Sequence, residues 1–169
     1  MAVLIADTSA LVSLGIVGRA ATDPLALCSH TYEVLVPEIV VDELEDVASY
    51  DDIHGRGAQT VLEQAGGFSV RSVSLDAAFP LDDGENAAVT LANDIDAAML
   101  LCDEFNQLGL IHASLANTRL VTTPTLLSVF VRNGQLDTDV AMSSLEGISE
   151  ARSWDTNQYV DRARSLLEE

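Results

Sequence analysis

The sequence contains no lysine and few cysteines, and these shortages exclude several kinds of site. All eight basic residues are arginine, so a phosphate-binding loop that depends on a lysine cannot occur, and the GxGxxG dinucleotide motif is also missing. The two cysteines, Cys28 and Cys102, are spaced for neither a zinc site nor a disulfide framework. Cys102 follows an apolar run, which favours a small buried residue over a nucleophile.

Long hydrophobic runs are missing as well. No stretch reaches the roughly 18 consecutive apolar residues of a membrane-spanning helix. The first apolar run stops at Asp7 and has no basic segment before it, which argues against a signal peptide. We therefore expect a cytoplasmic protein with no membrane partner. The 169 residues, 48% of them apolar, suit a single domain over 1–169 with a sizeable core.

The chain is strongly acidic, with 27 aspartates and glutamates and a formal net charge of −19. So large a charge would push the fold apart in dilute salt. At molar ionic strength the Debye length falls to about 3 Å and this repulsion largely disappears. Because the acids are spread along the whole chain, we interpret them as a solvated surface adapted to a high-salt cytoplasm, not as a site for basic partners. In this respect the composition resembles that of haloarchaeal proteins.

Short apolar runs alternate with helical patterns along the chain. The predicted strands are residues 3–6, 33–36, 68–73, 97–102 and 119–121. The predicted helices are residues 10–17, 37–48, 58–65, 84–93, 104–117, 124–132, 137–145 and 157–167. The remaining connections are predicted as irregular or weakly helical at 22–29, polar at 50–57, and a loop at 76–83. This alternation predicts an α/β fold with helices on both faces of a mainly parallel sheet.

Acidic residues directly follow two of the predicted strands. Asp7 ends the first apolar run and Asp103 ends the fourth. The carboxyl ends of parallel strands face one edge of the sheet, where sites form, so both acids are expected at that edge. Each acid could instead cap the following helix. Beside Asp7, however, Thr8 or Ser9 could supply that cap. Glu104 is an alternate ligand or a supporting group.

Two glutamates border the buried faces of predicted helices. Glu43 lies at the border of the apolar stripe of an acidic helix, and Glu45, on the other border, is the competing candidate. Glu85 follows Gly84 at the start of an alanine-rich helix. Its alternative role is that of a first-turn acid that complements the helix dipole. The glycine would leave room for a ligand or a metal to approach the backbone.

Four acids on successive elements, in the order Asp, Glu, Glu, Asp, predict a divalent-metal site. Gathered at one sheet edge, they would repel one another unless a cation neutralised them. Hard oxygen ligands without a Cys/His cluster suit Mg²⁺ or Mn²⁺, not zinc. The chemistry expected of such a site is hydrolysis of a phosphodiester by a water that the carboxylate-bound metal activates.

Other hydrolase classes fit less well. A Ser/His/Asp hydrolase is not favoured, because Ser9 has no obvious base among the scattered His30, His54 and His112. A phosphatase with an aspartyl nucleophile would need a second aspartate two residues after Asp7 and a catalytic lysine, and this chain has neither. A metal-dependent phosphatase on a similar sheet is the least favoured of the functions that stay open.

Read together, these motifs resemble those of PIN-domain ribonucleases, specifically the toxins of VapBC-type toxin–antitoxin pairs. The matching pieces are IADTSAL at 5–11, VPEIVVDEL at 36–44, DGENAA at 83–88 and LLCDE at 100–104. Residues 123–134 also resemble the penultimate helix of the family. Trp154 and the helix after it look like the extra C-terminal helices of one PIN subgroup.

The resemblance implies a three-layer α/β/α sandwich with a five-stranded parallel sheet and a C-terminal helical extension over about 135–169. It also implies metal-dependent RNA cleavage, frequent homodimers and a neutralising antitoxin protein. The acidic quartet of the family is matched by Asp7, Glu43, Glu85 and Asp103. Ser9 matches a small hydroxyl residue that commonly orients the first aspartate or a metal-bound water.

The chain departs from this resemblance in its basic residues. Relatives often carry one shortly after the fourth acid, where this chain has Phe105-Asn106-Gln107. Arg56, flanked by glycines, is predicted as a substrate contact, because a phosphate backbone is bound through cations. The scarcity of basic residues keeps a second function open, that of a catalytically silent PIN-like module that binds a partner protein.

Overall fold

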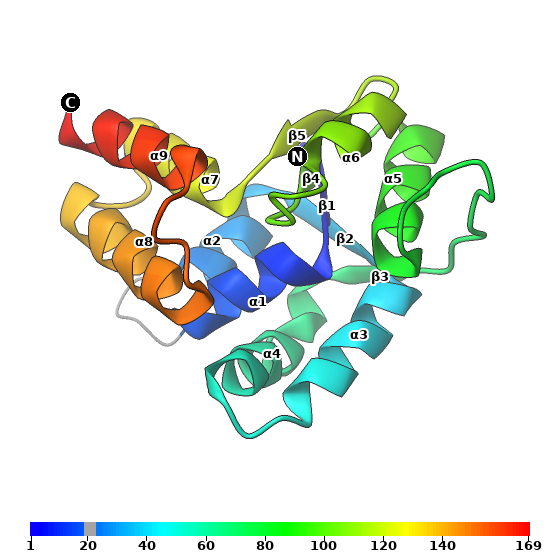
Figure 1. Ribbon diagram of the computed structural model, residues 1–169, viewed down its shortest axis with the longest axis horizontal. Coiled ribbons are helices and arrows are strands. Elements are labelled where there is room, and N and C mark those ends of the chain that lie inside the picture. The colour runs from blue at the N-terminus through cyan, green and yellow to red at the C-terminus, as the bar shows by residue number, and fades with distance from the viewer. Residues whose placement is uncertain (19–22) are drawn as a thin grey trace.

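A five-stranded, all-parallel sheet forms the centre of the computed structural model, which describes residues 1–18 and 23–169 (Figure 1). Its strands are β1 (Val3–Ala6), β2 (Glu33–Pro37), β3 (Ser69–Arg71), β4 (Met99–Leu101) and β5 (Arg119–Val121). They lie in the order β3-β2-β1-β4-β5. The chain first adds strands on one side of β1 and then returns to its other side. A topological switch point therefore lies between β1 and β4, at the place where α/β sheets bind ligands.

Helices connect the strands and cover the sheet (Figure 1). They are α1 (Thr8–Ile16), α2 (Pro24–Thr31), α3 (Glu38–Ala48), α4 (Ile53–Glu63), α5 (Asp83–Ile95), α6 (Leu108–Ser114), α7 (Thr123–Arg132), α8 (Thr138–Arg152) and α9 (Gln158–Glu168), with a short 3-10 turn, η1, at Ala65–Gly67. No helix among the described residues is long and apolar enough to span a membrane.

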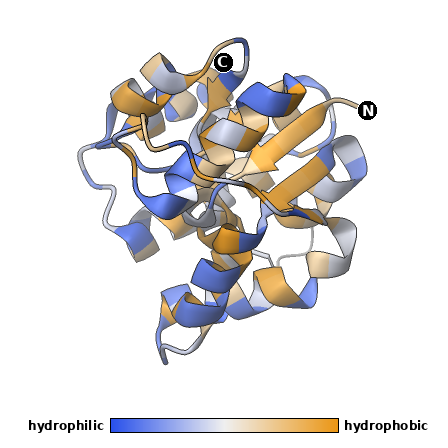
Figure 2. Cartoon of the chain, turned by 90° about the vertical axis from the view of Figure 1, so that its right-hand side faces the viewer, coloured by the Kyte–Doolittle hydropathy of each residue, from blue (hydrophilic) through white to orange (hydrophobic). Residues whose placement is uncertain are grey.

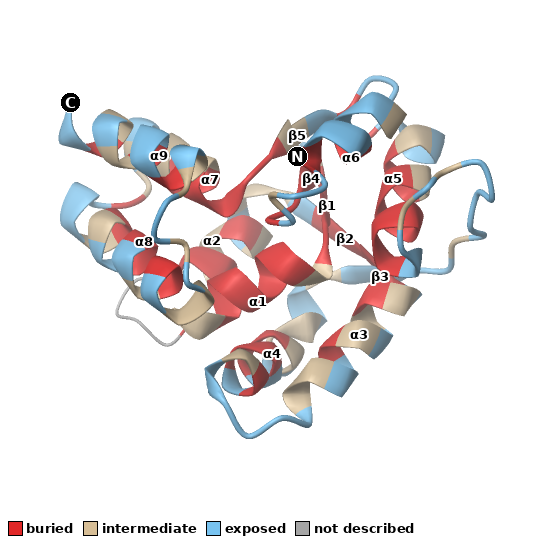
Figure 3. Ribbon diagram, in the orientation of Figure 1, coloured by how far each residue is buried: buried red, intermediate tan, exposed pale blue. Residues whose placement is uncertain are grey.

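Neighbouring residues of the central strands enter different apolar clusters, one on each face of the sheet. Leu4 and Val36 pack in the cluster that holds α1, α2, α7 and α8, whereas Ile5 and Leu100 pack beneath α5 and α6. This division follows from the pleat, which points successive side chains to opposite faces. The strands are hydrophobic along most of their length (Figure 2), and most of β1, β2 and β4 is buried (Figure 3). The predicted three-layer sandwich is confirmed.

The C-terminal helices share the core of the sheet domain. Leu145 of α8 and Val160 of α9 belong to the same apolar cluster as Leu4. On the surface, Arg164 of α9 donates two hydrogen bonds to the Glu146 carboxylate of α8, at 2.6 and 3.1 Å. The region predicted as a helical extension is therefore packed on the sheet domain, and α8 reaches α1.

The predicted polar connection at 50–57 is wrong in its second half, where α4 begins at Ile53. Asp52 caps this helix, because its Oδ1 accepts the Gly55 N–H at 2.7 Å. The two glycines of its first turns look unfavourable for a helix. They are accommodated because α1 packs so closely that a β-carbon at Gly15 would overlap the carbonyl of Gly57.

Several other boundaries differ from the prediction, and three of them are described here. The segment predicted as weakly helical at 22–29 starts at Thr22, outside the described residues, and the rest belongs to α2. Asp23 caps this helix by accepting the Leu25 N–H at 2.9 Å. The helix predicted over 104–117 is confined to α6. The helix predicted over 137–145 extends to Arg152, which has consequences for the site below.

Candidate active site

Two buried aspartates flank the switch point of the sheet. Asp7 directly follows β1, and its N–H donates to the carbonyl of Leu101 in β4 at 3.0 Å. Asp103 lies two residues beyond the end of β4. Only 4% of Asp7 and 5% of Asp103 is exposed. The neighbouring strands therefore deliver both acids to one edge of the sheet, as the sequence predicts.

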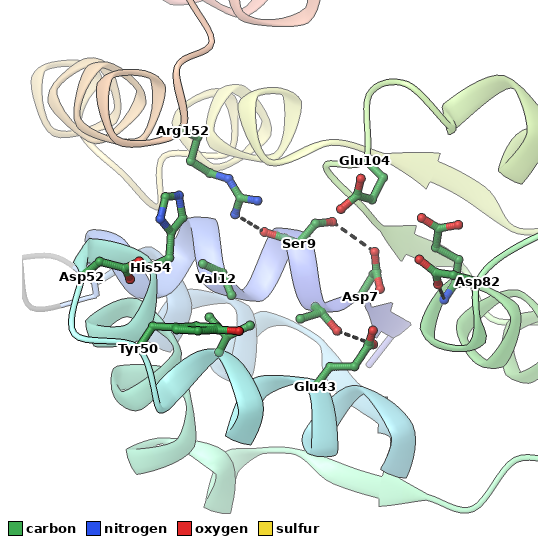
Figure 4. Close-up of a pocket in the computed structure, with 13 residues that line it drawn as sticks. Asp7, Ser9, Val12, Glu43, Tyr50, Asp52, His54, Asp82, Glu104 and Arg152 are labelled. Carbon is green, nitrogen blue, oxygen red and sulfur yellow. Dashed lines mark hydrogen bonds between the residues drawn. The ribbon is translucent and has the colours of Figure 1, made fainter.

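A pocket of about 380 Å³ opens above this edge (Figure 4). Its acidic lining residues come from five parts of the chain: Asp7, Glu43, Asp52, Asp82, Glu85 and Glu104. Three members of the predicted quartet, Asp7, Glu43 and Glu85, are thus brought together. Asp103, the fourth, lines an adjoining cavity instead. Like charges at this density are unfavourable unless they are protonated or neutralised.

Ser9 connects the two aspartates. Its hydroxyl donates to Asp7 Oδ2 and accepts the N–H of Asp103, both at 3.0 Å. The Cys102 thiol also donates to Asp7 Oδ2, at 3.2 Å. Burial raises the pKa of this thiol, so Cys102 is a hydrogen-bond donor and not a nucleophile. The Asp7 side chain caps no N–H of α1, which leaves its carboxylate directed to the pocket.

Glu43 is held at the pocket from α3. Its Oε1 accepts the hydroxyl proton of Thr8 at 2.8 Å. On its other side the carboxylate lies against Gly84, where a β-carbon would overlap it. The space that Gly84 leaves at the start of α5 is therefore filled by a carboxylate. Glu45, the competing candidate, is exposed and does not line the pocket.

Glu85 and Asp82 enter the pocket from the start of α5. Glu85 is only 6% exposed, and its N–H donates to Asp82 Oδ1 at 2.8 Å, so that Asp82 caps the helix. Asp82, which the sequence did not single out as a site residue, also lines the pocket. The signal for this second role is its position, three residues before a site glutamate on the first turn of the helix.

Asp103 is positioned by the start of α7. Its Oδ1 accepts the Thr123 N–H at 2.7 Å. Its Oδ2 is buried and has no hydrogen-bond partner among the described residues. Buried carboxylate oxygens are normally satisfied, so an unsatisfied one marks a place where an additional donor or cation would be stabilising.

Burial raises the pKa of each carboxyl group in the predicted quartet. For Asp7 and Glu43, burial is the largest cause, and neighbouring acids add to it. Burial also raises the pKa of Asp103, although the Thr123 amide opposes the shift. The pKa of Glu85 rises to about 7, through burial and then through the charges of Asp82 and Asp7. The site therefore holds protons at pH values where ordinary carboxyl groups are ionised.

A family model described as a PIN domain matches residues 3–169. This chain belongs to the PIN-domain family. PIN domains are generally nucleases, which agrees with an acidic pocket at the switch point of a parallel sheet. No curated protein matches the chain closely enough to name a relative.

One basic residue of this PIN domain reaches the acidic pocket from α8 (Figure 4). Arg152 Nη1 donates to the carbonyl oxygen of Ser9 at 2.8 Å and to the Ser13 hydroxyl at 3.2 Å. The sequence did not single out Arg152, because it lies far from the four predicted site acids along the chain and its helix is longer than predicted. Arg56 lies on α4 and lines a different cavity, so the structure does not bring it to the acids.

The donor set of this PIN domain fits a hard divalent cation. The lining carboxylates supply oxygen ligands, and Asp103, with its unsatisfied oxygen, lines the adjoining cavity. Among the described residues, however, no three Asp, Glu, His or Cys side chains already lie close enough to hold a metal ion. A bound cation would therefore have to draw the side chains together.

Proposed function

We propose that this PIN domain is a Mg²⁺- or Mn²⁺-dependent endoribonuclease that hydrolyses RNA phosphodiester bonds. One observation carries the proposal: Asp7, Glu43 and Glu85, from three separate elements, line a single pocket at the sheet's switch point. Asp103 adjoins it with an unsatisfied oxygen. The family supports nuclease chemistry in general, and the acidic oxygen donors support a metal-dependent form of it.

Asp7, Glu43, Glu85 and Asp103 would hold the cation. When bound, a divalent cation would neutralise these acids, polarise the phosphodiester and lower the pKa of a water molecule. Metal binding would also deprotonate the carboxyl groups, whose raised pKa values show how poorly they ionise beside one another. Cation affinity is therefore expected to rise with pH through the pKa of Glu85.

The chain's own side chains have separate tasks in this proposal. Ser9 orients Asp7, and Thr8 orients Glu43, through the hydrogen bonds described above. Glu85, with a pKa of about 7, can hold or release a proton at its carboxylate near neutral pH. Arg152 supplies a positive charge in the lining of the acidic pocket, where it can contact an RNA phosphate.

The toxin role and its partners are proposed on the resemblance of the sequence motifs. It predicts a cognate antitoxin protein and a homodimer. A short reading frame upstream that encodes a DNA-binding protein would support the antitoxin, and co-expression followed by size-exclusion chromatography would test both partners. The catalytic proposal does not depend on either of them.

The first prediction is that the Asp7→Asn variant loses RNA cleavage but keeps its fold. The purified protein is incubated in concentrated KCl with labelled structured RNA and Mn²⁺, and the products are resolved on a denaturing gel. Removing one buried ligand should lower the rate by at least about 100-fold, the scale of losing a key transition-state interaction. EDTA should abolish the wild-type cleavage.

Glu45→Gln serves as the matched control for Glu43→Gln, because both changes remove one negative charge from α3. Only the Glu43 variant should lose activity, since Glu45 does not line the pocket. Full activity in Asp7→Asn would refute the assignment. A folded wild-type protein that cleaves no RNA and binds no Mn²⁺ by calorimetry would instead favour the catalytically silent binding module.

A further inference from the structure

A second cavity opens beside the acidic pocket and shares part of its wall. Its volume is about 420 Å³, which lies in the range of sites that bind small ligands. His54, Glu104 and Arg152 line both cavities. The two are therefore neighbouring parts of one surface, and a chain-like ligand can cross from one to the other.

Aromatic rings from separate segments meet at this second cavity. Phe105 and Trp154 line it, with ring centroids 4.8 Å apart and planes inclined by 74°. Tyr159 stacks on Phe105 at 5.2 Å and 15°. Phe105 and Trp154 are only partly buried. Each of these two rings therefore presents part of its surface to the cavity, where an aromatic base could make contact.

Arg152 brings a positive charge to the wall between the cavities. Two of its hydrogen bonds fix Nη1 to α1, and its guanidinium carbon lies 5.8 Å from the centroid of the Trp154 ring. Among the described residues, no carboxylate forms a salt bridge with Arg152. A guanidinium has five N–H donors, so several remain available to an anion that enters either cavity.

The backbone turn after α8 holds the cation and the ring side by side. Ser153 adopts the left-handed conformation, with a φ of 57°, and the Trp154 N–H returns to the carbonyl of Ser149 at 2.9 Å. Asn157 then caps α9 by accepting the N–H of Tyr159 at 2.9 Å. A left-handed residue is a common end for an α-helix. Here the turn places Arg152 and Trp154 on the same wall of the cavity.

We propose that the second cavity is a nucleotide subsite for an unpaired stretch of RNA, in which Arg152 binds a backbone phosphate and Trp154 stacks on the adjacent base. This inference rests on the proposed nuclease function and adds to it a position for one base and one phosphate outside the acidic pocket. A base inside a duplex keeps both faces in the helical stack, so only an unpaired base can present a face to the tryptophan.

Stacking of a base on Trp154 is also compatible with the large negative charge of this chain. Asp103 and Glu104 line the second cavity and oppose any phosphate near them. In concentrated salt, phosphate contacts add little through counterion release. Stacking of a base on an aromatic ring depends on contact area and not on net charge, so it keeps its strength under those conditions. The subsite explains how so acidic a protein can hold RNA.

The test uses Trp154 as its own reporter, because it is the only tryptophan in the sequence. A short single-stranded oligoadenylate is titrated into Asp7→Asn in Mn²⁺, and into the wild type in EDTA, both in concentrated KCl. We expect saturable quenching of the tryptophan fluorescence and protection of the ring from acrylamide. A duplex of the same length should cause neither effect. No fluorescence change in either sample would overturn the subsite.

Variants of Trp154 and Arg152 then measure the contributions of the aromatic ring and of the positive charge to RNA binding separately. Binding is measured by the anisotropy of a labelled oligoadenylate. Trp154→Ala and Arg152→Ala should each weaken it about tenfold, whereas Trp154→Phe should keep most of the affinity. Arg119→Ala is the control. Arg119 is the first residue of β5, so it lies at the amino-terminal end of the strand, whereas the site lies at the carboxyl ends of the strands. Equal affinity of Trp154→Ala and the parent protein, with both folded by circular dichroism, would overturn the proposal.

The outcomes distinguish a failure of the subsite proposal from a failure of the proposed nuclease function. Cleavage by the wild type without quenching by the oligoadenylate would remove the subsite and leave the proposed function intact. Quenching that depends on Trp154, with no metal-dependent cleavage, would support a single-strand binding site and remove the nuclease proposal. Should Trp154→Ala unfold, the quenching and acrylamide measurements on the intact Trp154 still decide between these results.

Discussion

At the scale of single residues, the site combines acids that ionise poorly with hydroxyl groups that hold them in place. Ser9 shows this most clearly, since one hydroxyl bonds the carboxylate of Asp7 and the backbone of Asp103. A buried carboxyl group without a cation is stabilised by a proton. Protons and divalent cations should therefore compete for the same oxygens.

Glu85 should make the stability of the metal-free protein depend on pH. Its pKa is raised from 4.5 to about 7 in the folded state, so the folded protein binds more protons than the unfolded chain between these values. Its contribution to stability is present below about pH 4.5 and is lost as the pH rises through 7. Thermal unfolding in EDTA and fixed KCl should show a melting temperature that falls over this range.

Glu85→Gln should flatten that dependence, because glutamine does not titrate. Glu45→Gln, which removes an exposed charge, should keep the wild-type slope. If the Glu85 variant and the wild type lose stability in parallel, the raised pKa of Glu85 is not the cause.

Gly84 offers a way to move Glu43 without changing any charge. A methyl group at this position would overlap the Glu43 carboxylate, which sits at the end of a flexible side chain and can swing away. Gly84→Ala should therefore lower Mn²⁺ affinity and cleavage by about tenfold or more while changing stability by less than about 1 kcal/mol. Calorimetry and thermal unfolding on one sample would measure both. A loss of stability that matches the loss of activity would contradict this explanation.

At the scale of elements, the close contact of α1 with α4 determines how the first half of the chain packs. Gly15 and Gly57 allow the two backbones to approach, and Ala58 and Val61 bury the apolar face of α4 there. The packing also brings the start of α4, with Asp52 and His54, to the rim of the acidic pocket.

Gly15→Ala should destabilise the protein by about 1–3 kcal/mol, because the added carbon meets a backbone carbonyl that cannot rotate away. Gly109→Ala in α6 is the matched control, since nothing lies within 4 Å of its β-carbon position. That change should be neutral or stabilise by up to about 1 kcal/mol. Chemical unfolding in fixed KCl measures both, and equal effects would rule out the backbone contact as the cause.

The elements that the sequence predicts best are those whose signal is local. Strands β1 and β5 have the predicted bounds, because short apolar runs fix buried strands, and the acids that follow β1 and β4 reach the expected edge. Helix α4 was predicted too short because Gly55 and Gly57 are poor helix formers, and their compensation comes from Gly15, distant in sequence. A local pattern cannot carry such information.

The residues of the candidate site also divide into those that local sequence patterns predict and those that they do not. Asp7, Glu43 and Glu85 follow from strand ends and helix borders, so their grouping was predictable. Arg152 was not, because its place depends on the extra length of α8 and on bonds to the backbone of α1. Arg56 carried the expected charge but lies on the wrong side of α4 to join the acids.

At the scale of the whole molecule, the net charge of −19 dominates the dependence on solution conditions. Arg164 forms ion pairs with Glu146 and Asp161, but such exposed pairs contribute little. Most acids thus have no cationic partner to offset their repulsion, since the chain has only eight basic residues.

The melting temperature should therefore rise as KCl increases from about 0.1 M to about 1 M, while the Debye length falls from about 10 Å to about 3 Å. NaCl at equal ionic strength should act similarly, whereas an uncharged osmolyte at equal osmolality should not reproduce the full effect. Circular dichroism follows the transition. A melting temperature that is independent of salt would mean that the acids are too well solvated to repel one another.

Asp7 and Arg152 are far apart in the sequence, so the residues of the site are synthesised at different times during translation. Domains fold from the amino terminus as they are synthesised. The acids of β1, α3 and α5 therefore emerge before the arginine that bonds to Ser9. A nascent chain still attached to the ribosome would carry the acids without the wall that binds RNA. If the proposed nuclease function holds, a chain still on the ribosome would bind the surrounding RNA more weakly than the finished protein does, because Arg152 is among the last residues to be synthesised.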